Sequence, residues 1–304
     1  MAVLDQLTSL QAIELENKYG AHNYHPLPVV LNRGEGVYVW DVEGKKYYDF
    51  LSAYSAVNQG HCHPKIVDAM VQQAQTLTLT SRAFYNDMLG KYEKFASELF
   101  GFDKLLPMNT GAEAVETALK LSRKWAYEVK GIAENEAQII VCENNFHGRT
   151  TTIISFSNDP VARKNFGPYT DGFIKIEYDN LQALEEALNS TKNIAAFLVE
   201  PIQGEAGVYV QTGIARTGKM LAVDHENVQP DILILGKALS GGAYPVSGVL
   251  ANDNIMSVIQ PGNHGSTFGG NPIAAAVAIA ALEVVQEENL AANAERLGQL
   301  FRRK

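Results

Sequence analysis

Lys237 is the residue with the clearest potential for chemistry, because it directly follows the short apolar run 232–236. Four apolar residues and a glycine predict a buried strand whose carboxyl end carries the lysine. A lysine amine held in a partly desolvated place is a nucleophile that can attack an aldehyde. The alternative is a lysine at the end of a strand whose ammonium group extends into water. Other segments of the chain must distinguish the two.

A second group of candidate residues lies where an expected strand, Lys104–Met108, leads into a strong helix pattern. Thr110, Gly111 and Ala112 stand at the start of that helix, where backbone N–H groups have no partner within the helix. These groups and the threonine hydroxyl could bind a phosphate. The small-residue loop 264–272 offers similar donors before another helix. A helix cap without a ligand uses the same residue types, so both interpretations stay open.

The loop after the expected strand Gln138–Glu143 contains Phe146, His147 and Arg149. Either ring could stack on a flat ligand, and the guanidinium could bind a carboxylate through two hydrogen bonds. Each of these side chains could equally serve packing or a surface ion pair. Their place after a strand favours a ligand site.

The histidines and cysteines predict neither a metal site nor a disulfide framework. His61, Cys62 and His63 are adjacent, so on an extended segment their side chains point to opposite faces. No second pair with ligand spacing follows, and we expect no metal. Cys62 and Cys142 are the only cysteines, which suits a reducing compartment.

Composition excludes several classes of function. With 46% hydrophobic and 19% charged residues, the 304-residue chain can bury a sizeable core. A formal charge of −9 argues against nucleic-acid binding. The longest apolar stretch, Ile273–Leu282, is shorter than the roughly 18 residues of a spanning helix, so we expect no membrane span. The first residues carry acids and no continuous apolar stretch, and we expect a cytoplasmic location.

The spacing of apolar residues predicts alternating helices and strands. An amphipathic helix, Leu4–Tyr19, and a hairpin of Val37–Trp40 with Lys46–Phe50 come first. The later alternation implies an α/β fold, a mostly parallel sheet covered by helices on both faces, with ligands at the carboxyl ends of the strands. The other expected helices are 64–75, 86–100, 111–130, 271–289 and one that runs to Arg303, and the other expected strands are Lys104–Met108, Gln138–Glu143, Ile194–Pro201 and Ile232–Lys237.

Six short motifs follow one another along the chain: Asn58–Pro64, Thr110–Glu113, Phe146–Arg149, Val199–Gly207, Leu235–Gly242 and Gly265–Pro272. Their residues and their order resemble those of the class III pyridoxal-phosphate-dependent aminotransferases, along nearly all of the chain. Within that family, the segments 20–26 and 52–58 look most like the members that act on ornithine.

The resemblance implies a fold-type I transferase that uses pyridoxal 5′-phosphate. Lys237 would bind the cofactor covalently and then move a proton between the substrate carbon and the cofactor. Gly111 and Ala112 would hold the phosphate by their amides. Phe146 would stack on the pyridine ring, and Gln211 would bond to its phenolic oxygen.

The resemblance also implies a homodimer whose active site is shared across the interface. Ser266 and Thr267 would reach the phosphate bound by the neighbouring subunit. A site of this kind is complete only when two copies of the chain associate. The other partners would be small amino acids and 2-oxo acids.

The substrate implied by the resemblance is ornithine. Tyr24 and Arg149 would anchor its α-amino and α-carboxylate groups, Tyr54 would line the pocket, and Glu205 would pair with a second substrate arginine. The δ-amino group would pass to 2-oxoglutarate, giving glutamate 5-semialdehyde and glutamate. The alternative substrates are acetylornithine and 4-aminobutyrate, and Tyr24 discriminates because a free α-amino group needs a polar partner.

The chain departs from the family pattern between Val210 and Gln211. The family has about two dozen more residues there, a helix and a buried strand that carries the aspartate partner of the pyridine nitrogen, and a parallel crossover alone needs about a dozen. Losing that strand would leave neighbouring backbone groups unpaired unless the sheet closes up, at about 1–3 kcal/mol for each buried group. A further alternative is therefore an inactive form that binds the cofactor or only dimerises.

The expected domain organisation follows from the same pattern. Residues 1–50 would form an N-terminal helix and hairpin segment, and residues 51–284 the large cofactor-binding domain. Residues 285–304 would begin a C-terminal small domain, which the family continues beyond this point. The arginine expected to bind 2-oxoglutarate would belong to that continuation.

Overall fold

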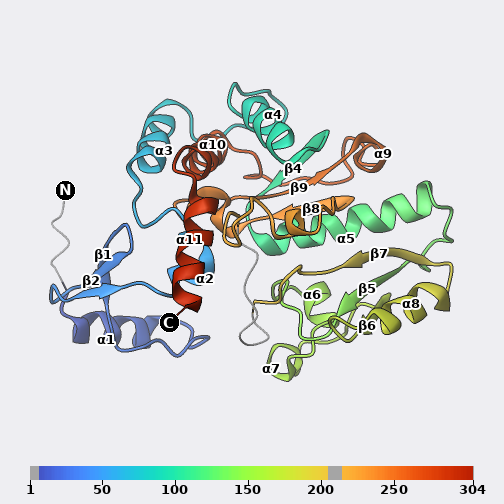
Figure 1. Ribbon diagram of the computed structural model, residues 1–304, viewed down its shortest axis with the longest axis horizontal. Coiled ribbons are helices and arrows are strands. Elements are labelled where there is room, and N and C mark those ends of the chain that lie inside the picture. Colours follow the sequence, from blue (N-terminus) through green and yellow to red (C-terminus); the bar gives the residue numbers. More distant parts are fainter. Residues whose placement is uncertain (1–6, 205–213, 304) are drawn as a thin grey trace.

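The main body of the chain consists of two three-stranded sheets joined by one long helix, α5, and a small antiparallel sheet lies beside them (Figure 1). This computed structural model describes residues 7–204 and 214–303. The strands are β1 (Leu31–Glu35), β2 (Tyr38–Asp41), β3 (Lys46–Tyr48), β4 (Lys104–Met108), β5 (Gln138–Cys142), β6 (Phe173–Ile176), β7 (Ile194–Leu198), β8 (Ile232–Leu235) and β9 (Ser247–Ala251). The α-helices are α1 (Ser9–Tyr19), α2 (Ser52–Ser55), α3 (Pro64–Thr76), α4 (Leu89–Phe100), α5 (Gly111–Glu128), α6 (Thr151–Ser155), α7 (Pro160–Arg163), α8 (Leu181–Ser190), α9 (Asp253–Met256), α10 (Pro272–Glu287) and α11 (Leu290–Arg302), and the 3₁₀ helices are η1 (Ala222–His225) and η2 (Lys237–Ser240).

The two larger sheets differ in strand direction. In the order β6-β5-β7 both ladders are parallel. In the order β4-β9-β8 the middle strand is antiparallel to both neighbours, so β4 and β8 run in the same direction. Gly248 lets β9 approach β4 closely, because a Cβ there would lie 2.6 Å from Leu105 Cδ1.

The α/β class is confirmed, but the strands do not form one continuous sheet. No ladder joins β7 to β8 among the described residues. The helix α5 contacts β4, β9 and β8 on one side of this gap and β7 on the other. The expected loss of a central strand has therefore left an opening between two half-sheets, and the half-sheets have not closed on each other.

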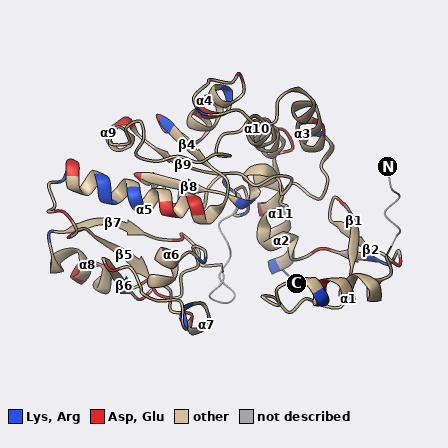
Figure 2. Cartoon of the chain, turned by 180° about the vertical axis from the view of Figure 1, so that it is seen from behind, with Lys and Arg blue, Asp and Glu red and all other residues tan. Residues whose placement is uncertain are grey.

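The core is densest around α10, which packs against α3, α4 and η2. Most of its residues are buried, and six of its sixteen are alanines, which let neighbouring helices approach closely. Its start is fixed by Asn271, whose side chain accepts a hydrogen bond from the amide of Ala274, and by Pro272 in the first turn. Charged residues lie on α5 and on other helices of the surface, whereas β7 and β8 carry none (Figure 2).

The N-terminal segment forms the sheet β1-β2-β3 and the exposed helix α1. The expected hairpin is confirmed as β2 and β3, and β1 extends it. The first residues of the expected opening helix lie outside the described part of the chain.

The expected domain boundaries near residues 50 and 284 stay predictions, and α10 runs through the boundary near residue 284. Across residues 7–204 and 214–303, no helix has the length and apolar character to cross a bilayer.

Candidate active site

One pocket of about 320 Å³ brings together four of the residues singled out by the sequence. It lies where β8 ends, and Gly111, Ala112, Phe146 and Lys237 all line it. These residues are far apart along the chain and come from three different strand-to-helix or strand-to-loop junctions. Convergence at the carboxyl end of strands is the usual position of ligand sites in α/β sheets.

Lys237 begins the 3₁₀ helix η2 immediately after β8 and Gly236. Its backbone has φ of 50°, a left-handed conformation that costs a non-glycine residue about 1–2 kcal/mol. The conformation is held because Ala238, Leu239 and Ser240, the rest of η2, are buried. Of the two alternatives for Lys237, the structure shows the exposed side chain, whereas the expected buried strand is only partly buried, since three of the four β8 residues are half-buried.

The helix α5 begins with a capping box, which leaves two backbone amides of the first turn without a hydrogen-bond acceptor in the described chain. The Thr110 hydroxyl accepts a hydrogen bond from the amide of Glu113, whose carboxylate accepts from the amides of Asn109 and Thr110. Burial opposes ionisation, but these hydrogen bonds lower the pKa of Glu113. Within the described residues, no hydrogen bond uses the amides of Gly111 and Ala112, so they remain as donors at the positive end of an 18-residue helix.

The second small-residue loop meets the first at Ser266. The side-chain amide of Asn109 donates to Ser266 Oγ at 2.8 Å, and the amide of Gly269 donates to the same oxygen at 3.0 Å. Thr267 beside it is exposed. The two loops therefore adjoin each other within one chain.

The loop after β5 places the rings of Phe146 and His147 in different surroundings. The Phe146 ring is 40% exposed and lines the pocket, and its amide donates to Glu200 Oε2 at 3.1 Å. His147 packs edge-on against Phe156, and burial lowers the pKa of its imidazole to about 4. The Arg149 guanidinium lies 5.9 Å from the centroid of the Phe146 ring. Both rings line the pocket, and Phe146 is the more exposed of the two.

Gly148 in the same loop was not a candidate residue, although the structure requires a glycine at this position. Its φ is 128°, and a Cβ there would lie 2.9 Å from the Cβ of Ala112. The loop can approach the start of α5 only with glycine at this position. A glycine between two candidate ligand residues was the available signal.

Tyr24 and Tyr54 are not brought into this pocket in the described chain. Tyr24 is 72% exposed on the segment between α1 and β1, and Tyr54 is 53% exposed on α2. All four residues of α2 have positive φ, and the last of them, Ser55, does line the pocket. Such strained segments are often found at functional sites. Glu205 and Gln211 lie outside the described residues.

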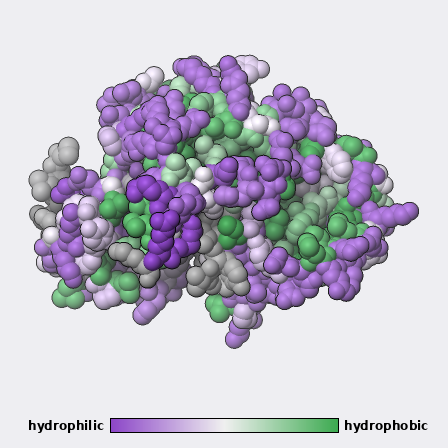
Figure 3. Space-filling view, viewed as in Figure 1, coloured by the Kyte–Doolittle hydropathy of each residue, from purple (hydrophilic) through white to green (hydrophobic). Residues whose placement is uncertain are grey.

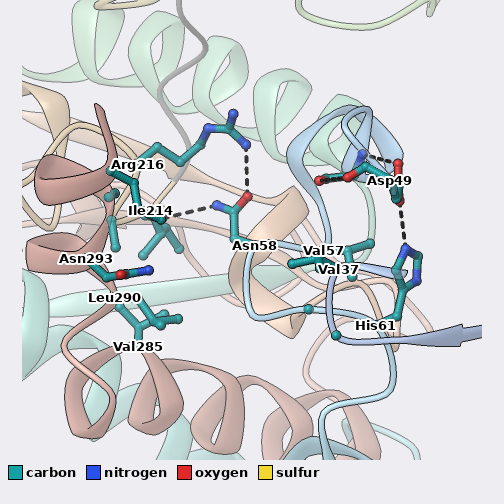
Figure 4. A pocket seen from close by; sticks show the side chains of 16 residues that line it. Val37, Asp49, Val57, Asn58, His61, Ile214, Arg216, Val285, Leu290 and Asn293 are labelled. Carbon is teal, nitrogen blue, oxygen red and sulfur yellow. Dashed lines mark hydrogen bonds and ion pairs between the residues drawn. The ribbon is translucent and has the colours of Figure 1, made fainter. Parts of the chain in front are cut away.

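A second pocket, of about 300 Å³, adjoins the first at Ile214, which lines both (Figure 4). Within it Arg216 Nη1 donates to the side-chain oxygen of Asn58 at 2.9 Å, and the Asn58 amide donates to the carbonyl of Ile214 at 3.2 Å. Burial lowers the pKa of Arg216. The pocket also holds residues of α11, which links the end of the chain to the N-terminal segment.

The histidines expected not to bind metal each have an acidic partner. His61 Nε2 lies 2.7 Å from Asp49 Oδ2, and His63 Nε2 lies 2.9 Å from Glu288 Oε1. No group of three metal-ligating side chains was found in the described segments.

The residues around Lys237 fit a flat, phosphorylated aldehyde. The lysine amine can react with an aldehyde, the free amides of α5 suit a phosphate, and the face of Phe146 suits a planar ring. A volume near 320 Å³ lies at the lower end of the range for ligand pockets.

Comparison with known proteins identifies one family. The model of the family described as aminotransferase class-III matches residues 19–210 and 209–304. The chain is 62% identical to the mitochondrial ornithine aminotransferase of Drosophila melanogaster, with 94% of the chain and 72% of that relative covered. It is 57% identical to the mitochondrial ornithine aminotransferase of Rattus norvegicus, with 96% and 72% covered.

Solved structures agree with this similarity. The ornithine aminotransferase of Toxoplasma gondii has a TM-score of 0.95 and 49% identity, with 97% of this chain and 76% of that chain covered. A second Toxoplasma gondii structure, with a TM-score of 0.96 and 49% identity over 98% of this chain and 76% of that one, is described as having partial occupancy of PLP at its active site. The acetylornithine aminotransferase of Elizabethkingia anophelis has a TM-score of 0.88 and 69% identity, with 97% and 78% covered.

The alignments support an internal gap in this chain. Since 94% of 304 residues is about 286, about 26 of the 312 positions aligned with the Drosophila melanogaster protein have no counterpart here. The family match also breaks into two segments that meet at residues 209–210. Both findings agree with the expected loss of about two dozen residues between Val210 and Gln211.

Proposed function

Because the chain belongs to the class III aminotransferases, we propose that it transfers the δ-amino group of L-ornithine to 2-oxoglutarate, giving L-glutamate 5-semialdehyde and glutamate. The observation that carries this proposal is the pocket in which Lys237 lies with the free amides of α5 and the exposed face of Phe146. Relatives named ornithine aminotransferase, 55–62% identical to the chain, support the choice of substrate.

Pyridoxal 5′-phosphate is the proposed cofactor, and when bound it withdraws electrons from the carbon that carries the transferred amine. Lys237 Nζ would hold the cofactor covalently and would serve as the group that moves a proton at that carbon. Gly111 and Ala112 hold the phosphate with their amides, and Phe146 packs against the ring. Gln211, outside the described residues, is proposed to bond to the phenolic oxygen.

The proposed substrate contacts are Tyr24, Tyr54, Arg149 and Glu205. Arg149 lies beside Phe146 but lines the neighbouring pocket and not that of Lys237, and its guanidinium is proposed to turn toward a substrate carboxylate. Tyr24 is proposed to accept the free α-amino group, which leaves the δ-amine to react. Tyr24 and Tyr54 are both exposed in the single chain. The proposal therefore requires that other groups pack around the pocket and bring these two side chains to the substrate.

A homodimer is part of the proposal. Ser266 and Thr267 act on the phosphate of the neighbouring subunit, and their loop already adjoins the start of α5. A cytoplasmic location stays a prediction, and the Drosophila and rat relatives are named mitochondrial.

Acetylornithine is the second candidate substrate, favoured by the 69% identity to the Elizabethkingia anophelis structure. The two substrates differ at the α-nitrogen, which is free and charged in ornithine and acylated in acetylornithine. A Tyr24→Phe variant removes the polar partner of a free amine. We expect it to raise KM for ornithine and to leave KM for acetylornithine unchanged.

A form that binds the cofactor or dimerises without turnover is the third candidate, favoured by the missing positions between Val210 and Gln211. The strand expected there carries the carboxylate that keeps the pyridine nitrogen protonated in this family. In the described part of the chain, Glu200 is the acidic residue that lines the pocket.

Visible absorbance of the purified chain, titrated with pyridoxal 5′-phosphate and then with ornithine, tests the proposal. We expect an absorbance band that requires Lys237 and that bleaches when ornithine is added. A band that persists with both ornithine and acetylornithine supports the inactive form. If a Lys237→Ala variant gives the same band as the wild type, the assignment of Lys237 is wrong.

A further inference from the structure

The gap between β7 and β8 is an open cavity of about 420 Å³. Its walls are Ala195–Leu198 of β7 and Ile232 and Ile234 of β8. Its floor is α5, through residues that include Leu119 and Trp125. Figure 3 shows apolar side chains at the surface of this part of the molecule.

The two walls are strand edges without a neighbour. β7 pairs with β5 on one side, β8 pairs with β9 on one side, and no ladder among the described residues uses their other edges. Each free edge presents a row of backbone N–H and C=O groups, which is a template for another strand. Two such edges on one cavity can be satisfied together by one inserted strand.

The side chains of the cavity define what can enter. Phe197 is 37% exposed, and Ile232, Leu233 and Ile234 are half-buried. The cavity therefore leaves apolar surface in contact with solvent. Asp231, at the entrance of β8, is the charged residue of the lining. An occupant therefore needs uncharged, apolar side chains in its middle. β8 has four residues, or about 13 Å of strand, so four or five residues of the occupant would face it.

Alignment with the relatives points to the type of occupant. The break in the family match, at residues 209–210, falls in the chain between β7 and β8, the two strands that border the cavity. About 26 aligned positions of the Drosophila melanogaster relative have no counterpart in this chain. We propose that the cavity is a docking site for one extended apolar peptide supplied by another molecule, which pairs with β7 and β8 and joins the two half-sheets.

This proposal does not depend on transamination, but the two sites are adjacent. Ile234 lines both the cavity and the Lys237 pocket. A strand seated in the cavity therefore ends against the wall of the candidate active site. Addition of a strand to an exposed sheet edge is a common mode of peptide recognition, in which main-chain hydrogen bonds give affinity and side-chain pockets give selectivity.

The fluorescence of Trp125 offers a direct test. The chain has two tryptophans, and the other, Trp40, lies on β2 away from the cavity. A Trp40→Phe chain leaves Trp125 as the single reporter. The probe is a synthetic peptide with the sequence that the Drosophila melanogaster relative carries between the counterparts of Val210 and Gln211, with any tryptophan replaced. Titration is done without cofactor, and repeated with Lys237→Ala, so that failure of the active-site proposal does not affect it.

We expect a saturable shift of the Trp125 emission to shorter wavelength. Phe197→Asp and Ile232→Gln, two independent changes in the walls, should each weaken binding at least tenfold. Leu188→Asp is the matched control, because Leu188 is 49% exposed on α8 and does not line the cavity. Circular dichroism establishes that each variant is folded.

Three results would overturn the proposal. One is an emission spectrum that the peptide leaves unchanged up to its solubility limit. Another is equal weakening by Leu188→Asp. The last is a second copy of the chain as occupant, seen in sedimentation as an oligomer that Phe197→Asp dissociates and that the peptide does not change.

Discussion

Strands β8 and β9 lie side by side in one sheet, but only β9 is enclosed. β8 consists of Ile-Leu-Ile-Leu, yet three of its four residues are half-exposed. β9 contains a serine and a glycine, yet all five of its residues are buried. β9 has a strand on each side and β8 has one, so burial here follows the number of neighbours and not the hydrophobicity of the strand.

The largest effect that can test this contrast is the loss of a leucine from each strand. Leu250 of β9 and Leu233 of β8 are direct cross-strand partners. Leu250→Ala should lower the free energy of unfolding by about 2–5 kcal/mol, since it leaves a cavity in a fully packed place. Leu233→Ala should cost about 1 kcal/mol, because the side chain is already half in water. Urea unfolding measures both, and equal losses would contradict the contrast.

A second test uses His147, a half-buried residue whose imidazole Nε2 is buried without a hydrogen-bond partner in the described residues. The pKa of His147 is lowered to about 4 by burial, against about 6.5 in the unfolded chain. Between these two pKa values the unfolded state binds more protons than the folded state, so the free energy of unfolding falls as the pH falls from about 6.5 to 4. Above about pH 6.5, His147 does not make the stability depend on pH. We expect a loss of about 2 kcal/mol between pH 7 and pH 5.

The control for this test is a ring that does not titrate. His147→Phe should remove this part of the pH dependence, and urea unfolding at the two pH values gives the difference between the proteins. If the two proteins lose the same stability between pH 7 and pH 5, the lowered pKa of His147 is contradicted.

The smallest expected effect compares the caps of two helices. Thr110 caps α5, which contacts both half-sheets, and Asn180 caps α8, which lies against β6. Replacing either with alanine should cost about 1 kcal/mol of stability. Only Thr110→Ala should also weaken pyridoxal 5′-phosphate binding, by a few fold, because only α5 begins at the Lys237 pocket. Equal cofactor binding by both variants would contradict the assigned phosphate site.

Most elements with a strong pattern could be predicted. The strand Lys104–Met108 has the predicted bounds, and α5 and α10 differ from prediction by one or two residues at their ends. β9 was not expected, because Gly248 and Ser247 interrupt the apolar pattern of a strand. Gly248 is required because β4 approaches β9 closely at this position. That contact joins segments far apart in the chain, so the sequence around Gly248 does not indicate it.

The candidate site divides in the same way. Lys237, Gly111, Ala112 and Phe146 were predicted from their place after strands, and the structure brings them to one pocket. The pattern alone left the choice between Phe146 and His147 open, and only the family resemblance favoured Phe146. The choice depends on Phe156, nine residues after the histidine, which packs against it.

The sequence by itself determined the residue types of the site and the class of the fold, because these depend on local order along the chain. Comparison with the family located the missing stretch after Val210. Only the tertiary structure decided that the half-sheets stay apart, since β7 and β8 can close only if the packing of both against α5 changes. It also decided that Lys237 is exposed and that an apolar cavity lies beside its pocket. Burial depends on which segments pack together, and this is a property of the whole chain.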